Sequence, residues 1–290
     1  MKKLIKKVFR FIIPDRFIKP KNQRFNRFIK INDEIGDKSF RLYLREDSLM
    51  ERIFLEKGLY GEWEKESLKI WAHLSKEANT IIDIGANTGV FSMLACNNNP
   101  DAKIIAIEPI DINFGILMKN ILKNKFHIHP VKAALSNVSG TAKMYMKKDQ
   151  LNYMTSVNDN RYLDPPQQPG TPEVVEVEVP TYTFQEIDEL YNYPKIDLVK
   201  IDVEGHEVPV LENMMDRIKK DRPILLIEVI GDENADQINN MFKPLGYKFI
   251  SIDEQNISRV VESVWDNHHH NFLFCDESTI KSLQQKGLVA

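Results

Sequence analysis

The stretch "TIIDIGANTGVFSMLACN", residues 80–97, joins a β-branched apolar run to a helical pattern through two glycines. Its first part predicts a buried strand, and the part from Asn87 onward predicts the helix that follows. In doubly wound sheets ligands bind outside the carboxyl ends of the strands, and the first strand–helix turn is the usual seat of a cofactor. Gly85 allows a tight turn there, because it has no Cβ atom that would block a ligand.

Short apolar runs alternate with helical patterns along the following chain, which predicts a doubly wound α/β fold with a mostly parallel sheet. Two β patterns between the third and fourth parallel strands predict a β insertion, and the last two runs predict an antiparallel closing pair. The parallel strands are predicted at residues 80–86, 102–109, 126–135, 195–202 and 222–230, the insertion at 140–148 and 174–184, and the closing pair at 247–253 and 271–276.

The first turn discriminates between two classes of cofactor. A dinucleotide needs the pattern G-x-G-x-x-G, but Asn87 and Val90 occupy the places of its second and third glycines. Asp83 also puts a negative charge where a pyrophosphate would lie. S-adenosylmethionine carries an ammonium group, a sulfonium group and no phosphate, so we predict it as the cofactor.

A second acid supports a nucleoside pocket at this turn. Glu108 ends the second predicted strand, 19 residues after Gly89. A carboxylate about twenty residues past the glycine loop accepts hydrogen bonds from ribose hydroxyls in folds of this topology. Together with Asp83, Gly85 and Gly89, Glu108 predicts the adenosine site.

The fourth strand ends in the charged stretch "VKIDVEGHEV", residues 199–208. Because this strand should lie beside the first, its end should face the cofactor. We predict that His206 removes the proton of an acceptor hydroxyl, and that Asp202 or Glu204 orients His206 or takes the proton directly. Glu228 is the equivalent residue on the fifth strand.

A divalent ion is the rival explanation for these acids. Asp202, Glu204, Glu228 and His206 could supply it with oxygen and nitrogen ligands. No ligand spacing in the sequence requires a metal, so none is predicted.

Composition restricts the partners and the compartment. Residues 1–30 hold eleven Lys or Arg against one Asp, whereas the remaining residues carry 28 basic and 41 acidic side chains. The acidic remainder argues against nucleic acid as a partner. Cys96 and Cys275 cannot build a disulfide framework, which favours a reducing, cytoplasmic location.

The basic end has the pattern of an amphipathic helix. Residues 1–20 place apolar side chains on one face and lysines around the other. This pattern predicts peripheral contact with an anionic membrane at its inner face, or docking on the protein's own acidic domain. We divide the chain into a basic segment with a helical lead-in (1–60), a catalytic domain (61–276) and a C-terminal tail (277–290).

Six stretches, taken in order, resemble the FkbM family of S-adenosylmethionine-dependent methyltransferases. They are "DIGANTGVFS", "IEPIDINFGILMKNILKN", "AALSNVSG", "LVKIDVEGHEVPVLEN", "IEV" and "NFLF". The resemblance implies a Rossmann-like class I methyltransferase fold and O-methylation, often of sugar hydroxyls in bacterial glycans or natural products. It implies that Asp83, Gly85, Asn87 and Glu108 bind the cofactor, and we predict Ala134 as a further cofactor-binding residue.

The sequence thus predicts an enzyme that transfers a methyl group to a small-molecule or glycan hydroxyl. Two other classes stay open. One is a nicotinamide-dependent oxidoreductase on the same fold, which Asn87 and Val90 disfavour. The other is a non-catalytic nucleoside-binding scaffold, which would not need the charges clustered around His206.

Overall fold

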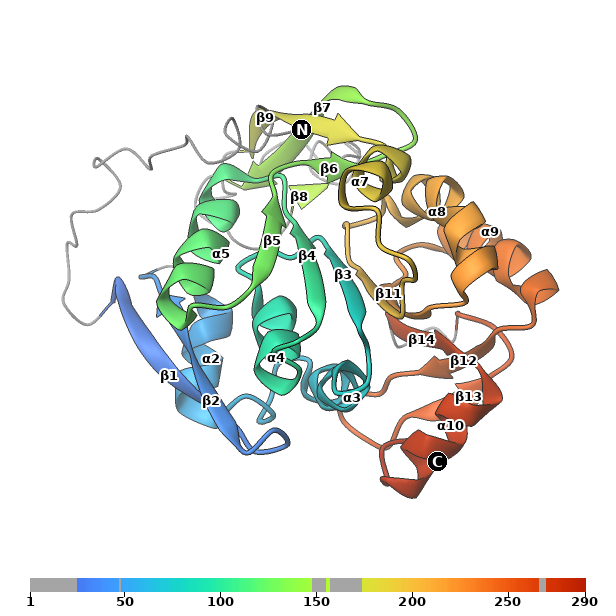
Figure 1. Cartoon of the computed structure of the whole chain (residues 1–290), viewed down its shortest axis with the longest axis horizontal. Helices are drawn as coiled ribbons and strands as arrows, with labels where there is room; N and C mark the ends of the chain where they lie inside the picture. The colour runs from blue at the N-terminus through green and yellow to red at the C-terminus, as the bar shows by residue number, and fades with distance from the viewer. Residues whose placement is uncertain (1–24, 47, 148–154, 157–173, 266–269) are drawn as a thin grey trace, which may run out of the picture.

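The computed structural model describes residues 25–46, 48–147, 155–156, 174–265 and 270–290. Within these residues the chain forms a hairpin, a large central sheet with helices on both faces, and a smaller second sheet (Figure 1). In chain order the elements are β1 (Arg27–Asp33), β2 (Lys38–Leu44), α2 (Leu49–Lys57), α3 (Lys65–Ser75), β3 (Thr80–Ile84), α4 (Val90–Asn98), β4 (Lys103–Ile107), α5 (Asp111–Asn124), β5 (Ile128–Val131), β6 (Ala134–Leu135), β7 (Gly140–Lys147), β8 (Thr155–Ser156), β9 (Val174–Tyr182), α7 (Phe184–Tyr191), β10 (Leu198–Ile201), α8 (Glu207–Asp221), β11 (Ile224–Glu228), α9 (Asp232–Phe242), η2 (Lys243–Leu245), β12 (Lys248–Ser251), β13 (Arg259–Val261), β14 (Asn271–Cys275) and α10 (Glu277–Gln285).

The central sheet has the strand order β13-β12-β14-β11-β10-β3-β4-β5. The strands from β11 to β5 pair in parallel, whereas β14, β12 and β13 pair antiparallel. The mostly parallel sheet and its antiparallel closing strands are therefore confirmed. Every residue of β3 and β10 is buried, which explains why these strands read as continuous apolar runs.

Alternate residues of each central strand point to opposite faces of the sheet. One face packs on α3, α4 and α5, and the other on α7, α8 and α9. Figure 1 shows α4 and α5 on one side of the central strands and α8 and α9 on the other. Asp83, Lys200 and Glu228 have the parity of the residues that face α3 and α4, so their side chains belong to one face.

The predicted β insertion forms the second sheet, in the order β6-β9-β7-β8. Strands β7 and β9 pair antiparallel over their whole length, from Gly140 opposite Thr181 to Lys147 opposite Val174. This sheet lies at the end of the central sheet where β5 leads into β6 (Figure 1). It therefore borders the edge at which the parallel strands end.

The lead-in to the domain differs from the prediction, because it contains a β-hairpin before α2. In β1 and β2 the buried residues alternate with exposed ones, and a period of two is the pattern of a strand. Ile29, Ile31, Phe40 and Leu42 pack into the same core as α3 and α4. Residues 1–20 lie outside the described residues, and the division of the chain into three parts stays a prediction.

No helix in the described part of the chain is both long enough and apolar enough to cross a bilayer.

Candidate functional site

The turn between β3 and α4 adopts backbone conformations that depend on glycine. Gly85 and Gly89 have φ angles of 78° and 93°, and Asn87 lies between them at 51°. A Cβ atom on Gly85 would stand 1.8 Å from the backbone oxygen of Asp202, at the end of β10. Gly85 therefore lets the first turn lie directly against the end of β10. The sequence predicted a glycine that leaves room for a ligand, whereas the space beside Gly85 is taken by the backbone of Asp202.

Glu108 follows β4 and braces this turn. Its Oε2 accepts the N–H of Asn87 at 2.8 Å, and its Oε1 accepts the N–H of Ile110 at 2.9 Å. Burial raises the pKa of Glu108 to about 7, although these hydrogen bonds and one from Asn113 oppose the shift. The predicted ribose-binding acid thus lies against the turn that was predicted to hold the cofactor.

Asp83 is completely buried on β3. Its Oδ2 accepts a hydrogen bond of 2.6 Å from Ser92 Oγ in α4, and its Oδ1 has no hydrogen-bond partner among the described residues. Burial raises the pKa of this carboxyl group, and the ammonium of Lys200 partly offsets the rise. Lys200 is the residue opposite Asp83 in the register of β10 and β3.

Lys200 pairs with Asp202 at the end of β10. The distance from Nζ to Oδ2 is 2.6 Å, and Nζ lies 4.7 Å from the centroid of the Phe91 ring. Burial alone lowers the pKa of Lys200, but the carboxyl groups of Asp202, Asp83 and Glu64 outweigh burial and raise it. Burial likewise raises the pKa of Asp202, and Lys200 outweighs it and holds that pKa below its usual value.

Three carboxyl groups gather at this edge of the sheet. Asp202, Glu204 and Glu228 each offer an oxygen atom within 4.8 Å of the others. The pKa of Glu228 lies well above its usual value because of burial and because Asp202 and Glu204 are close. Glu204 has a φ angle of 55°, a left-handed conformation that is costly for a residue with a Cβ atom. These are three of the four residues that the sequence analysis considered as possible metal ligands, and His206 is not among the group.

Sequence reasoning missed Glu64, which joins this group from the residue before α3. Burial raises its pKa to about 8, Lys200 opposes the rise, and Asp202, Glu254 and Glu204 add to it. Its φ angle is 42°. No local pattern could have identified Glu64, because it lies outside the parallel strands and reaches the site only through the position of α3.

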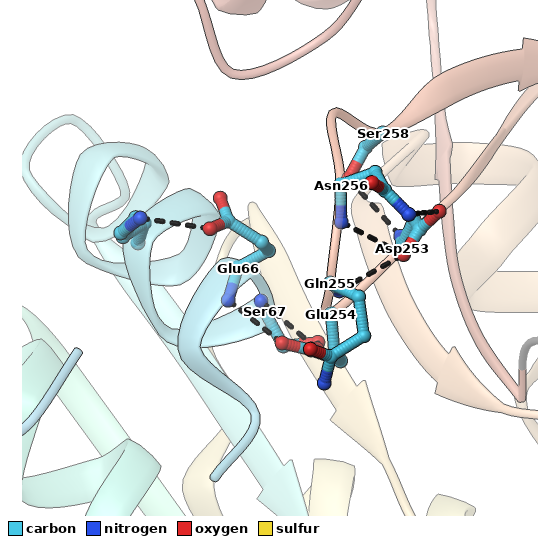
Figure 2. A network of polar contacts seen from close by, with 8 residues as sticks. Glu66, Ser67, Asp253, Glu254, Gln255, Asn256 and Ser258 are labelled. Atoms are coloured by element: carbon cyan, nitrogen blue, oxygen red, sulfur yellow. Dashed lines mark hydrogen bonds and ion pairs between the residues drawn. The ribbon is translucent and has the colours of Figure 1, made fainter. Parts of the chain in front are cut away.

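Glu254 anchors the start of α3, as Figure 2 shows. Its carboxylate accepts hydrogen bonds from the N–H of Glu66 at 2.7 Å, the N–H of Ser67 at 3.2 Å and the hydroxyl of Ser67 at 2.5 Å. Asp253 accepts the N–H groups of Gln255 and Asn256, both at 2.9 Å, and so fixes the turn that carries Glu254. The loop after β12 therefore holds α3, and with it Glu64, in place.

His206 is the N-cap residue of α8, and its Nε2 lies 3.0 Å from Ser136 Oγ. Burial lowers the pKa of His206, which keeps its ring neutral near pH 7. The hydrogen bond of His206 is thus made with Ser136. The prediction that Asp202 or Glu204 orients His206 would have placed one of these acids there instead.

Glu207 braces the loop before α8. It is completely buried; its Oε1 accepts the N–H of Gly205 at 2.6 Å, and its Oε2 accepts from Asn234 at 3.0 Å. This carboxylate holds the loop that carries Glu204 and His206.

Ala134 begins β6 and pairs with Thr181 in the second sheet. It is partly buried and packs against a small cluster formed by Ile110, Met144 and Val179. Ile110 also donates its N–H to Glu108. Ala134 is therefore connected through Ile110 to the acid that was predicted to bind the ribose.

The carboxyl groups at the turn fit S-adenosylmethionine better than a dinucleotide. Asp83 and Glu108 are buried carboxyl groups, and Asp83 Oδ1 still lacks a partner. Acceptor oxygens suit ribose hydroxyls and a cationic amino acid moiety, whereas they would repel a pyrophosphate. Lys200, which could have paired with a phosphate, is paired with Asp202.

Comparisons with known proteins find curated methyltransferases that are similar to this chain. The methyltransferase sdnD of Sordaria araneosa is 28% identical over 46% of this chain and 60% of its own length. The hexuronic acid methyltransferase AglP of Haloferax volcanii is 26% identical over 59% of this chain and 63% of its own length. The chain thus spans about 60% of the length of these curated relatives.

A solved structure of a methyltransferase FkbM from Methylobacillus flagellatus superposes with a TM-score of 0.43 and 14% identity, covering 68% of this chain and 43% of that one. The model of the methyltransferase FkbM domain matches residues 83–249, which is more than half of the chain. This protein therefore belongs to the methyltransferase FkbM domain family, as its motifs predicted, and S-adenosylmethionine is its cofactor.

Proposed function

We propose that this protein transfers the methyl group of S-adenosylmethionine to a hydroxyl oxygen. The proposal rests on two groups of residues that lie together at one edge of the central sheet, one at the glycine turn and one after β10. Asp83 and Glu108 border the glycine turn, and Asp202 lies against that turn, because its backbone oxygen fills the space beside Gly85. A cofactor bound at the turn would thus have the charged loop after β10 as its neighbour.

In this proposal Glu108 accepts hydrogen bonds from the ribose hydroxyls, and Asp83 faces the cationic amino acid moiety. Gly85, Asn87 and Gly89 shape the turn around the ligand, and Ala134 contributes to its wall. The cofactor supplies a methyl group on a positively charged sulfur. Most of the acceleration of such an in-line displacement can come from positioning, which a rigid strand edge provides.

The reaction also needs a base. A bond forms between the acceptor oxygen and the methyl carbon, the carbon–sulfur bond breaks with its electron pair left on sulfur, and the hydroxyl proton leaves. Neutral His206 is the group that accepts this proton, because its lowered pKa leaves a ring nitrogen unprotonated near pH 7. Asp202, held ionised by Lys200, stabilises the imidazolium that forms or takes the proton itself.

A sugar hydroxyl is the acceptor that we propose, in a bacterial surface glycan or a glycosylated natural product. The relative AglP is named a hexuronic acid methyltransferase, which supports a carbohydrate acceptor. We also propose that the protein works at the cytoplasmic face of the membrane, and that residues 1–20 bind anionic lipid there.

Calorimetric titration of the full-length protein with S-adenosylhomocysteine and with NAD tests the cofactor. We expect binding of the first and none of the second, and the reverse result contradicts the proposal. Transfer of labelled methyl from S-adenosylmethionine to a panel of free sugars, nucleotide sugars and purified glycans then tests the acceptor.

The variant His206→Ala tests the base in the same assay. Glu233→Gln is a matched control, because Glu233 is exposed on α9. We expect a loss of about 100-fold or more in methyl transfer for His206→Ala and none for the control. Unchanged turnover of His206→Ala removes this residue from the mechanism, and Asp202 is then the base.

A further inference from the structure

The outer face of the β1–β2 hairpin carries only positive charge. Every second residue of both strands is buried in the core, so the residues between them belong to the outer face. The outer positions are Phe28, Lys30 and Asn32 on β1, and Ser39, Arg41 and Tyr43 on β2. None of the six is acidic, and the exposed acids Glu34 and Asp37 lie in the turn between the strands.

Lys30 and Arg41 lie directly opposite each other in the register of the hairpin. The Cβ atoms of such a pair stand about 4.5–5.5 Å apart, and like charges at this position destabilise a hairpin. Neither side chain has an ion-pair partner among the described residues. An anionic partner from outside the chain would relieve this repulsion.

Helix α5 adds two lysines to the same face. The helix lies beside the hairpin (Figure 1), and two of its asparagines accept the N–H groups of β2. Lys119 Nζ lies 4.1 Å from the centroid of the Tyr43 ring, and Lys123 Nζ lies 5.1 Å from that of the Phe28 ring. Burial lowers the pKa of Lys119, and the nearby guanidinium of Arg45 lowers it further. Several cations are therefore crowded on one surface.

An exposed apolar side chain accompanies these cations. Leu122 is 69% exposed, the largest value for any large apolar side chain in the described part of the chain. Because residues three apart are neighbours on a helix, Leu122 shares a face of α5 with Lys119. Lysines around an exposed apolar side chain are typical of helices at an anionic membrane, where the cations meet the headgroups and the apolar side chain enters the acyl boundary. A nucleic-acid backbone would offer Leu122 no apolar partner.

We propose that the outer face of the hairpin and the adjoining face of α5 form a surface that binds anionic membrane lipid. Its cations are Lys30, Arg41, Lys119 and Lys123, and its apolar residue is Leu122. The basic residues 1–24 lead into β1, so a membrane that they bind lies within reach of the hairpin. The inference extends the membrane contact proposed for residues 1–20 to the folded domain, and it does not depend on methyl transfer.

This hairpin–α5 surface is separate from the proposed cofactor site. Glu108 lies just before α5, whereas Lys119 and Lys123 lie toward the other end of the helix. A helix rises 1.5 Å per residue, so the two lysines lie about 12–18 Å along the axis from its first residue. Substitutions on the surface should therefore leave the binding of S-adenosylhomocysteine unchanged.

Co-sedimentation of the full-length protein with vesicles measures its affinity for a membrane. Vesicles of phosphatidylcholine with about one third of phosphatidylserine are compared with vesicles of phosphatidylcholine alone. We expect binding to the first and none to the second. The binding should weaken as salt rises from about 0.1 M to about 0.5 M, because salt screens the attraction.

The double variant Lys30→Gln with Arg41→Gln should weaken vesicle binding about tenfold or more, since each basic residue near an anionic surface contributes about fivefold. The same variant should be at least as stable to urea as the wild type, because the repulsion across the hairpin is gone. A purely structural role for the two side chains predicts the opposite change in stability.

Lys248→Gln with Lys281→Gln is the matched control. It removes two exposed lysines from β12 and α10, on the other side of the molecule (Figure 1), and should change the affinity by less than about twofold. Leu122→Gln keeps the proposal testable if the hairpin variant does not fold. Glutamine is a good helix former, and loss of the apolar contact should weaken binding about fivefold. Circular dichroism reports whether each variant is folded.

Wild-type protein that does not bind the anionic vesicles overturns the surface. An equal loss for both double variants also overturns it, because the effect would then come from net charge alone. Duplex DNA serves as a competitor, and a hairpin variant that loses affinity for DNA but not for vesicles makes nucleic acid the partner and overturns the lipid.

The contact proposed for residues 1–20 fails separately. A full-length variant with Lys2, Lys3, Lys6 and Lys7 changed to glutamine tests it in the same assay. If only this variant loses affinity, the hairpin–α5 surface is wrong, and if only the hairpin variant does, the contact of residues 1–20 is wrong. The binding of S-adenosylhomocysteine decides the cofactor independently of both.

Discussion

The substitution Gly85→Ala tests whether the first turn must lie directly against β10. The new Cβ atom would stand 1.8 Å from the backbone oxygen of Asp202 and 2.8 Å from its carbonyl carbon. Ordinary contact between such atoms needs about 3.5 Å, so the turn and the end of β10 would have to separate by more than about 1 Å. Both neighbours are backbone atoms, and no side-chain rotation can relieve the overlap.

The expected cost has two parts. Alanine at a φ angle of 78° loses about 1–2 kcal/mol relative to glycine. Moving the end of β10 weakens the hydrogen bond from Asp202 N to Ile84 O, now 3.0 Å, which is worth about 1 kcal/mol. We therefore expect Gly85→Ala to lower the free energy of unfolding by about 3 kcal/mol. A displacement of about 1 Å at the reacting centre should also lower methyl transfer about 100-fold.

Gly115→Ala is the matched control. Gly115 lies inside α5, and a Cβ atom there would meet no atom within 4 Å. Alanine should stabilise the helix by about 0.5–1 kcal/mol, so the two substitutions should change stability in opposite directions. Urea unfolding measures both, and calorimetry measures the binding of S-adenosylhomocysteine. A Gly85→Ala protein with wild-type stability and affinity would refute the close approach of the turn to β10.

Four further predictions concern single carboxylates and their partners. Burial raises the pKa of Glu108 from 4.5 to about 7 in the folded protein. The ligand-free protein should therefore be more stable below pH 4.5, where Glu108 is protonated, than above pH 7, where it is ionised, by about 3 kcal/mol. This extra stability is lost as the pH rises from 4.5 through 7. Unfolding of the wild type and of Glu108→Gln at pH 4, 6 and 8 measures the loss, and a stability difference between the two proteins that does not change with pH contradicts it. The affinity for S-adenosylhomocysteine should increase as the pH rises from 5 to 7, because the ionised carboxylate is the better acceptor for ribose hydroxyls; calorimetry at each pH tests this, and a flat profile means that Glu108 does not contact the ribose. Glu254→Gln should lower the free energy of unfolding by about 1–2 kcal/mol, since Gln carries no charge for the N-terminus of α3; equal denaturation midpoints would show that the cap is dispensable. Lys200→Met should destabilise the protein by about 3 kcal/mol because it leaves the carboxylate of Asp202 without its ion-pair partner, and addition of Asp202→Asn should recover most of that loss; a double mutant with no recovery contradicts the pairing.

The position of the site followed from the sequence because parallel strands end at a common edge. Asp83, Glu108, Asp202 and Glu228 each end or nearly end such a strand, so their meeting required only the correct strand order. Because successive residues of a strand point to opposite faces of the sheet, the positions of these four acids then place their side chains on the same face.

The residues that the sequence did not predict act through contacts that no local pattern encodes. Glu64 reaches the site because Glu254, which is 190 positions further along the chain, holds the start of α3. Glu207 belongs to the charged stretch after β10, where nothing in the sequence indicated its burial. It is completely buried, and its carboxylate accepts the N–H of Gly205. The contact of His206 with Ser136 depends on how the second sheet packs beside α8, which the strand pattern leaves undetermined.

The hairpin of β1 and β2 was missed for a different reason. Residues 1–60 were taken together as a basic segment with a helical lead-in, and the membrane helix was predicted for residues 1–20 alone. The alternation in "RFIKIND" and "KSFRLYL" is a strand pattern, and the inward residues Ile29 and Leu42 complete the core beside α5 and α4.

A solved complex with S-adenosylhomocysteine tests most directly whether two buried acids and a glycine turn make an adenosyl pocket. We predict the ribose hydroxyls about 3 Å from the carboxylate of Glu108, and the sulfur facing the end of β10 near Asp202. A ligand bound elsewhere, or one whose ribose has no contact with Glu108, would contradict this account.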